Sequence, residues 1–212
     1  GWDAAREQIL KNQIARGIVP ASTRLAPRPD DIPAWNSLTP EQKKMYARQM
    51  EAFAGQMEHV DYEIGRMIAA LERTGMLDNT LILLTSDKGA SGEGGLEGTH
   101  NELLVLNGIA RTSFEENRKF YDAWGSAETD NHYHAGWAMA GNAPFRYFKQ
   151  TTHNGGTAVP MIAHWPKGIR AKGELRTMAA RARALIGLAD AALADTDVGA
   201  SDGISRRIQK RP

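Results

Sequence analysis

One long amphipathic stripe limits what this chain can fold into. Apolar residues recur at alternating steps of four and three: Tyr46, Met50, Phe53, Met57, Val60, Ile64, Met67 and Leu71. This spacing places all eight on one face of an α-helix. Thr39 suits the N-cap, Pro40 the first helical position, and Gln42 completes a capping box. With Gly75 as a stop signal, we expect one helix over residues 39–74. Core packing against a sheet is favoured over a cofactor role for its methionines.

Two short apolar segments predict β-strands. Residues 81–85 carry no charge and are bounded by turn signals, which indicates a strand buried on both faces. Residues 159–165 predict a second strand. A long helix, a tight turn and an apolar strand form half of a βαβ unit, so the expected fold class is α/β. Ligands gather at the carboxyl ends of strands in such sheets, where Asp87 and Lys88 stand.

The rest of the chain gives weaker signals. Residues 3–16 predict a short amphipathic helix, and four prolines make residues 18–38 an extended connector. Residues 113–124 suggest another helix, whereas residues 125–143 look irregular and polar. We expect residues 177–212 to form a divergent tail. Its first part is Ala-rich and suits a helix, whereas its end is expected to be disordered.

Composition excludes several classes of function. Lys and Arg number 26 against 25 Asp and Glu, so the net charge of +1 gives no electrostatic case for binding nucleic acid or an anionic membrane. No apolar run approaches the roughly 20 residues of a membrane span. The chain has no Cys, which excludes disulfides, thiolate metal sites and a cysteine nucleophile. Because the sequence begins at Gly1 with a helix under way, we expect a segment upstream.

Several residues suit a catalytic or binding role, but each also has a purely structural interpretation. Asp87 suits a metal site but also a turn cap. The five glycines of residues 89–98 lack the Gly-Lys-Ser/Thr ending of a phosphate loop. His132 and His134 have the spacing for a shared metal, although an exposed loop pair is the favoured interpretation. Lys149 precedes a Gly-Gly turn. It could bind an anionic ligand, or it could be an ordinary solvent-exposed lysine. No Gly-x-Ser-x-Gly or His-Glu-x-x-His motif occurs.

Short blocks follow one another in a specific order: GWD at 1–3, GIVP at 17–20, PAW at 33–35, MEHVD at 57–61, LDNTLI at 77–82, TSDKGAS at 85–91, PFR at 144–146 and KQTTHNGG at 149–156. Together they resemble the sulfatase family, in particular bacterial arylsulfatases of the alkaline-phosphatase-like superfamily. The resemblance covers about residues 1–176. The resemblance implies that residues 1–176 are part of an α/β catalytic domain and that residues 177–212 are a divergent tail. The domain is expected to have an alkaline-phosphatase-like sheet flanked by helices, which is incomplete in this chain.

The resemblance also implies a reaction and a site. Sulfatases hydrolyse sulfate esters, here of a small molecule or a glycan, with a formylglycine made from a Cys/Ser-x-Pro-x-Arg motif and a calcium ion held by Asp and Asn. Asp87 matches the family's late calcium-binding aspartate, and Lys149 matches the late catalytic lysine that contacts the sulfate. None of the nine prolines has Cys or Ser two residues before it. We therefore expect the nucleophile upstream of Gly1, and no turnover from this chain alone.

Lys88 stands where the family has its Asn ligand. Asn offers a neutral oxygen to calcium, whereas lysine offers none and brings a positive charge. The sequence therefore predicts weakened or lost calcium binding, or a lysine turned away from the metal. The resemblance favours a periplasmic location. Two alternatives stay open: a phosphoester or phosphonate hydrolase of the same superfamily, and a non-catalytic fragment whose helical stripe docks a partner.

Overall fold

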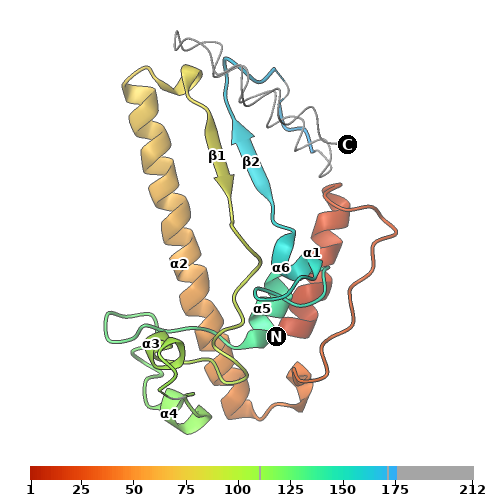
Figure 1. Ribbon diagram of the computed structural model, residues 1–212, viewed down its shortest axis with the longest axis vertical. Coiled ribbons are helices and arrows are strands. Elements are labelled where there is room, and N and C mark those ends of the chain that lie inside the picture. The colour runs from red at the N-terminus through yellow and green to blue at the C-terminus, as the bar shows by residue number, and fades with distance from the viewer. Residues whose placement is uncertain (110, 171, 176–212) are drawn as a thin grey trace.

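The computed structural model describes residues 1–109, 111–170 and 172–175. Its elements, in chain order, are α1 (Trp2–Ala15), η1 (Trp35–Ser37), α2 (Pro40–Arg73), η2 (Leu77–Asn79), β1 (Ile82–Thr85), α3 (Glu102–Leu106), α4 (Phe114–Arg118), α5 (Ala135–Gly141), α6 (Asn154–Thr157) and β2 (Met161–His164). Figure 1 shows α2 running the length of the molecule beside the two strands, with the short helices gathered near its beginning. The helix predicted for residues 177–194 lies outside the described residues.

The helices predicted over residues 3–16 and 39–74 form as α1 and α2, and the capping signals predicted for α2 are confirmed. Thr39 Oγ1 accepts a hydrogen bond from Gln42 N at 3.2 Å, and Gln42 Oε1 accepts one from Thr39 N at 3.0 Å. This capping box satisfies two of the donors that a helix leaves unpaired at its start. Gly75 follows the helix with φ of +71°, a left-handed conformation that favours glycine. Gly17, after α1, adopts φ of +69° for the same reason.

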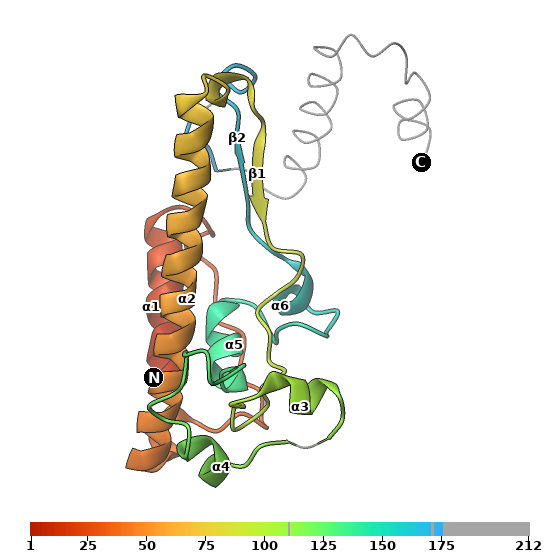
Figure 2. The same ribbon diagram turned by 90° about the vertical axis from the view of Figure 1, so that its left-hand side faces the viewer.

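The apolar stripe of α2 is buried only near the beginning of the helix. Met45 and Tyr46 are buried, whereas Met57, Val60 and Met67 are exposed. The prediction that the whole stripe packs in a core is therefore wrong for these three residues. A helix of 34 residues is about 50 Å long, whereas strands of four residues span roughly 13 Å. The described sheet is too small to cover such a helix, as Figure 2 shows from the side.

The two strands form where the sequence predicts them, but their burial differs. β1 and β2 pair antiparallel, with Ile82 opposite His164 and Thr85 opposite Met161. Leu83 and Leu84 are 46% and 43% exposed, so the prediction of a strand buried on both faces is wrong for β1. In the described part of the chain the sheet has only these two strands, and Ile162 of β2 is exposed as well.

The hydrophobic core joins α1, α2 and α5. Its buried members are Trp2, Ile32, Leu38, Met45, Tyr46, Trp124, Ala135, Met139 and Ala140. α5 lies within residues 125–143, so the prediction of irregular structure there is wrong. Two glycines give this helix a low intrinsic propensity, and tertiary packing compensates. A Cβ on Gly136 would lie 2.6 Å from the ring of Trp2, so glycine allows α5 to approach α1.

The remaining predictions concern the helix near residue 113 and membrane-spanning segments. The helix suggested over residues 113–124 is confirmed only for its first part, since α4 covers Phe114–Arg118 and turns follow. Ser113 and Glu116 close a capping box at its start. Of the described helices, none combines the length and the apolar character needed to cross a bilayer.

Candidate functional site

The site predicted at the carboxyl end of β1 begins with Asp87 and Lys88. They lie in a loop of residues 86–98, here called the β1 loop. Lys88 Nζ contacts Asp87 Oδ2 at 2.5 Å, and the side chain of Asp87 is 77% exposed. The hydrogen bond from Lys88 lowers the pKa of Asp87 below its ordinary value, and the charge of Lys149 adds to the effect. The carboxylate of Asp87 therefore stays ionised and faces solvent.

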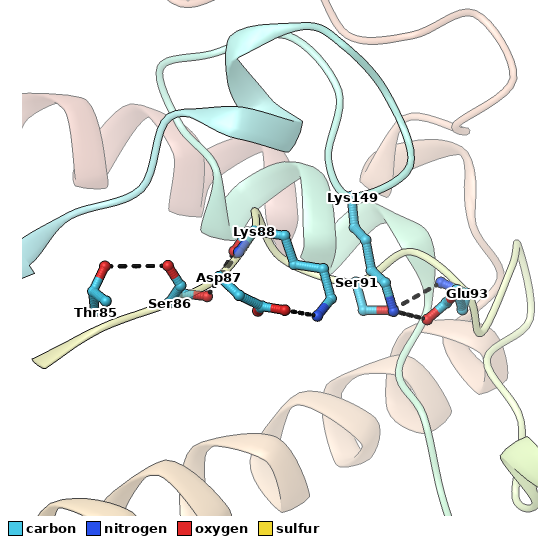
Figure 3. A network of polar contacts seen from close by, with 7 residues as sticks. All are labelled: Thr85, Ser86, Asp87, Lys88, Ser91, Glu93 and Lys149. Carbon is cyan, nitrogen blue, oxygen red and sulfur yellow. Dashed lines mark hydrogen bonds and ion pairs between the residues drawn. The ribbon is translucent and has the colours of Figure 1, made fainter. Parts of the chain in front are cut away.

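A second loop carries the predicted anion-binding lysine. Residues 144–153, here called the lysine loop, lie against the β1 loop. Lys149 N donates to Ala90 O at 2.9 Å, and Gly89 N donates to Gly156 O at 3.0 Å. Ala90 N donates to the side-chain oxygen of Asn142 at 3.0 Å. These bonds hold together two segments about sixty positions apart in the sequence, and Figure 3 shows Asp87, Lys88 and Lys149 in one row.

Glycines permit this close approach of the two loops. A Cβ on Gly89 would lie 1.7 Å from Gly155 O, and a Cβ on Gly155 would lie 2.1 Å from Tyr147 O. Both distances are impossible for real side chains, so any other residue would push the loops apart. At Gly89 and Gly155, glycine is therefore required for the packing of one backbone against the other.

The backbone is strained on both sides of Lys149. Tyr147 has φ of +61° and Gln150 has φ of +71°, values that non-glycine residues adopt rarely. Such strain costs on the order of 1–3 kcal/mol per residue and concentrates at functional sites. Hydrogen bonds maintain it: Asn142 Nδ2 donates to Tyr147 O at 3.3 Å, and Gln150 Nε2 donates to Glu93 Oε1 at 2.8 Å. The surrounding structure thus fixes the direction of the lysine between them.

Glu93 is the partner of Lys149, and sequence reasoning missed it. Lys149 Nζ forms an ion pair with Glu93 Oε2, and the two side chains are 23% and 15% exposed. Ser91 Oγ donates to the same carboxylate at 2.9 Å. The hydrogen bond from Lys149 lowers the pKa of Glu93. The only signal in the sequence is one acidic residue among glycines, which has no period or motif to mark it.

The two loops lie side by side, but the ammonium of Lys149 is turned to Glu93, and Lys149 does not line the cavity at Asp87. Asp87 and Lys88 line this open cavity of about 980 Å³. Its other walls come from α2, including Arg48 and Phe53, and from residues 124–133. The cavity gives a ligand access to the exposed carboxylate of Asp87.

The two histidines do not form the exposed pair that the sequence favours. Both are buried, so this prediction is wrong. His134 stacks on Trp2 with ring centroids 4.4 Å apart, and its Nδ1 accepts a hydrogen bond from Gly136 N at 2.8 Å. Burial lowers the pKa of His134 to about 3. His134 is thus a neutral N-cap of α5 within the aromatic core, and α5 itself was not predicted.

Comparison with known proteins decides the family. The family model described as "Sulfatase" matches residues 12–194, which is most of the chain. The chain belongs to the sulfatase family.

Sulfatases of very different organisms resemble the chain. An uncharacterized sulfatase of Schizosaccharomyces pombe is 33% identical over 179 residues, which cover 80% of this chain and 30% of that protein. An arylsulfatase of Klebsiella aerogenes is 29% identical over 179 residues, covering 82% of this chain and 36% of that protein. A steryl-sulfatase of Rattus norvegicus is 29% identical over 115 residues, covering 54% of this chain and 14% of that protein. The chain spans about a third of the length of the first two relatives.

Family membership confirms the resemblance seen in the sequence and implies an alkaline-phosphatase-like α/β fold. The helices and small sheet of the described residues are consistent with an incomplete domain of that kind. The family match passes position 176 and ends at 194. The boundary between residues 1–176 and the tail stays a prediction, because residues 176–212 lie outside the described part.

The described residues of this sulfatase do not by themselves fit a calcium ion. Calcium takes six to eight oxygen ligands, and in the described ranges no three His, Cys, Asp or Glu side chains converge as a metal site. The carboxylate of Asp87 is in contact with the ammonium of Lys88, which offers no ligand oxygen. Calcium binding therefore stays a prediction, and no chemical step below depends on it.

Proposed function

We propose that this chain contributes to the active site of a sulfuric ester hydrolase, with Lys149 binding the sulfate group of the substrate. Membership of the sulfatase family supports this reaction class, and arylsulfatases and a steryl-sulfatase are among the relatives. One observation carries the assignment of Lys149. Its loop is hydrogen-bonded to the β1 loop that carries Asp87, through Lys149 N and Ala90 O at 2.9 Å.

The chemistry of Lys149 suits this role. An ammonium is a compact point charge with three donors. Glu93 engages the ammonium and orients it, and the other donors are available to sulfate oxygens. Positive charge fixed beside the transferring group stabilises the negative charge that develops there in the transition state. Because Glu93 and the strained backbone hold Lys149 in place, binding requires little reorganisation of the protein.

Asp87 is the proposed carboxylate of the metal site, with Lys88 at the position of the family's Asn. The exposure of Asp87 and its lowered pKa keep an ionised oxygen available at the open cavity. Lys88 opposes a divalent cation at the same point, which is why we propose weak calcium affinity for this sequence.

The nucleophile belongs, in this proposal, to a formylglycine outside these 212 residues. The chain contains no Cys, and no Ser stands two positions before any of its nine prolines. Lys149 and Asp87 cannot attack sulfur unaided, so the chain alone is expected to be inactive. Incubation of the 212-residue chain with 4-nitrophenyl sulfate tests this. Turnover above that of a buffer blank contradicts the proposal.

The reaction class is tested on the complete protein that contains the chain. We expect hydrolysis of 4-nitrophenyl sulfate to exceed that of 4-nitrophenyl phosphate and of a phenylphosphonate ester. The coding sequence upstream of Gly1 is expected to hold a Cys/Ser-x-Pro-x-Arg motif. A Thr or Ser nucleophile outside such a motif, together with faster phosphoester hydrolysis, would favour the phosphohydrolase alternative.

A further inference from the structure

The ammonium of Lys88 lies beside Asp87, in the place where a cation bound to that carboxylate would lie. Lys88 Nζ contacts Asp87 Oδ2 at 2.5 Å, and Figure 3 shows the side chain of Lys88 reaching to the carboxylate. Calcium binds carboxylate oxygens at about 2.3–2.6 Å, so a calcium ion on the same oxygen would have to displace the ammonium. The negative charge of Asp87 thus already has a positive partner from within the chain.

The local backbone supports this conformation of Lys88. Side chains of neighbouring residues in a strand point to opposite faces, but the chain bends at residues 87–89, shortly after β1. On one side of the bend, Ser86 Oγ donates to Lys88 O at 2.7 Å. On the other side, Gly89 N donates to Gly156 O at 3.0 Å. The bend is therefore anchored at both ends, and the two charged side chains meet instead of pointing apart.

The ammonium of Lys88 is open to a ligand. Lys88 and Asp87 both line the cavity of about 980 Å³, and the side chain of Lys88 is 42% exposed. Within the described ranges, the carboxylate of Asp87 is the only one that this ammonium contacts. An ammonium has three N–H donors, so donors remain for the oxygens of an anion in the cavity. Lys88 therefore presents a positive charge to the cavity, and Asp87 holds it in position.

An ammonium tethered to the chain differs from a calcium ion in ways that an experiment detects. It carries one positive charge rather than two, it requires no free metal, and a chelator cannot remove it. It is also in position before the ligand arrives, which reduces the loss of freedom on binding. A site with such a cation keeps its affinity for an anion in EDTA, whereas a calcium site loses it.

We propose that the ammonium of Lys88 serves in place of a metal ion at this site, so that the protein binds the sulfate group of its substrate without calcium. The inference rests on the proposed function, because it takes the cavity beside Asp87 as part of the place where the sulfate group binds. It goes beyond a weak affinity for calcium, since it makes Lys88 a residue that binds the anion.

Calorimetric titration of the complete protein with sodium sulfate, in EDTA and in calcium chloride, tests the proposal. Low ionic strength is used, because salt screens exposed charges. We expect the wild-type protein to bind sulfate with the same dissociation constant, within about twofold, in both solutions. Sulfate is the probe because its binding is measured without any turnover.

Substitutions of Lys88 assign the binding to its ammonium. Lys88→Met keeps a side chain of similar length without the charge and is expected to weaken sulfate binding about threefold in EDTA. Calcium should not restore this affinity, because methionine supplies no oxygen ligand. Lys88→Asn is expected to bind weakly in EDTA and to regain affinity in calcium chloride. Lys11→Met, on the exposed face of α1, is the control, and thermal unfolding verifies the fold of each variant.

Two results would overturn the inference: a larger loss of sulfate affinity by the wild-type protein in EDTA, or a Lys88→Met variant that binds sulfate as tightly in EDTA as Lys11→Met does. Failure of the proposed function looks different. In that case Lys149→Gln leaves both sulfate binding and the hydrolysis of 4-nitrophenyl sulfate unchanged, while Lys88→Met still weakens sulfate binding.

Discussion

The ammonium of Lys149 and the carboxylate of Glu93 form an ion pair that joins the lysine loop to the β1 loop. Ser91 and Gln150 donate to the same carboxylate. The pair therefore has two consequences. It stabilises the contact between the loops, and it sets the direction in which Lys149 presents its other donors.

The contribution of this pair to stability is expected to depend on pH. The hydrogen bond from Lys149 lowers the pKa of Glu93 in the folded state, so the stabilisation is complete above the ordinary Glu pKa and is lost as the pH falls through the lowered value. Glu93→Gln is expected to reduce the free energy of unfolding by about 1 kcal/mol at pH 7, and by less at pH 3. Urea unfolding at both pH values measures this.

The matched control for that experiment is Glu128→Gln, which removes an exposed carboxylate in another loop. It should change stability little at either pH. If the Glu93→Gln and Glu128→Gln variants lose equal stability at pH 7, the pair does not hold the two loops together.

The buried His134 is expected to make the stability of the fold depend on pH in a second, higher range. Burial lowers its pKa to about 3, whereas an unfolded histidine takes up its proton near pH 6.5. The unfolded state then binds more protons between these values, so the stability of the fold decreases as the pH falls below about 6.5. One such group accounts for a loss of about 2 kcal/mol between pH 7.5 and pH 5.

The variant His134→Asn tests this assignment. Asn removes the titrating group and keeps an N-cap acceptor for Gly136 N. The variant is expected to be less stable at pH 7.5, because it loses the stacking on Trp2, but to show a flatter pH dependence. His59→Asn, on the exposed part of α2, should keep the wild-type slope. Equal slopes in all three proteins would show that His134 does not cause the effect.

The capping box at the start of α2 gives a prediction independent of the site. Thr39→Ala removes the acceptor of Gln42 N and is expected to cost about 1 kcal/mol of unfolding free energy. Thr39→Ser retains the hydroxyl and should restore most of it. Chemical denaturation of the three proteins measures the difference, and a Ser variant no better than Ala would contradict the capping role.

Local signals predicted the parts of the fold that local chemistry determines. Thr39, Gln42 and Gly75 mark the ends of α2 because their side chains or φ values satisfy the helix termini. Asp87 and Lys149 were selected as candidate residues because they lie in short sequence blocks that resemble the sulfatase family. Whether the two side chains serve one site depends on tertiary structure, which periodicity does not report, and their shared role stays a prediction.

Long-range packing explains what the sequence did not reveal. α5 contains two glycines and no strong helical period, and it forms because Trp2 covers Gly136. His134 is buried because that helix exists. Glu93 becomes a partner of Lys149 only when the two loops meet. The exposure of Met57 and Met67 likewise depends on how little of α2 the small sheet covers.

Calcium binding offers a test of the proposed metal position. In the complete protein that contains this chain, Lys88→Asn replaces an ammonium at Asp87 with a neutral oxygen donor and is expected to raise calcium affinity at least about tenfold. Lys11→Asn, on the exposed face of α1, is the control. Calorimetric titration with calcium decides the matter, and equal affinity of the wild-type protein and the Lys88→Asn variant would reject the role of Lys88.

The most direct test of the whole account is the kcat/KM of the complete protein for 4-nitrophenyl sulfate, with and without Lys149. Lys149→Ala is expected to lower it by about a hundredfold or more, as loss of a charge-stabilising donor does, while Lys11→Ala leaves it unchanged. A Lys149→Ala variant that hydrolyses the sulfate ester as fast as the Lys11→Ala variant would contradict the assignment of Lys149 to the sulfate group.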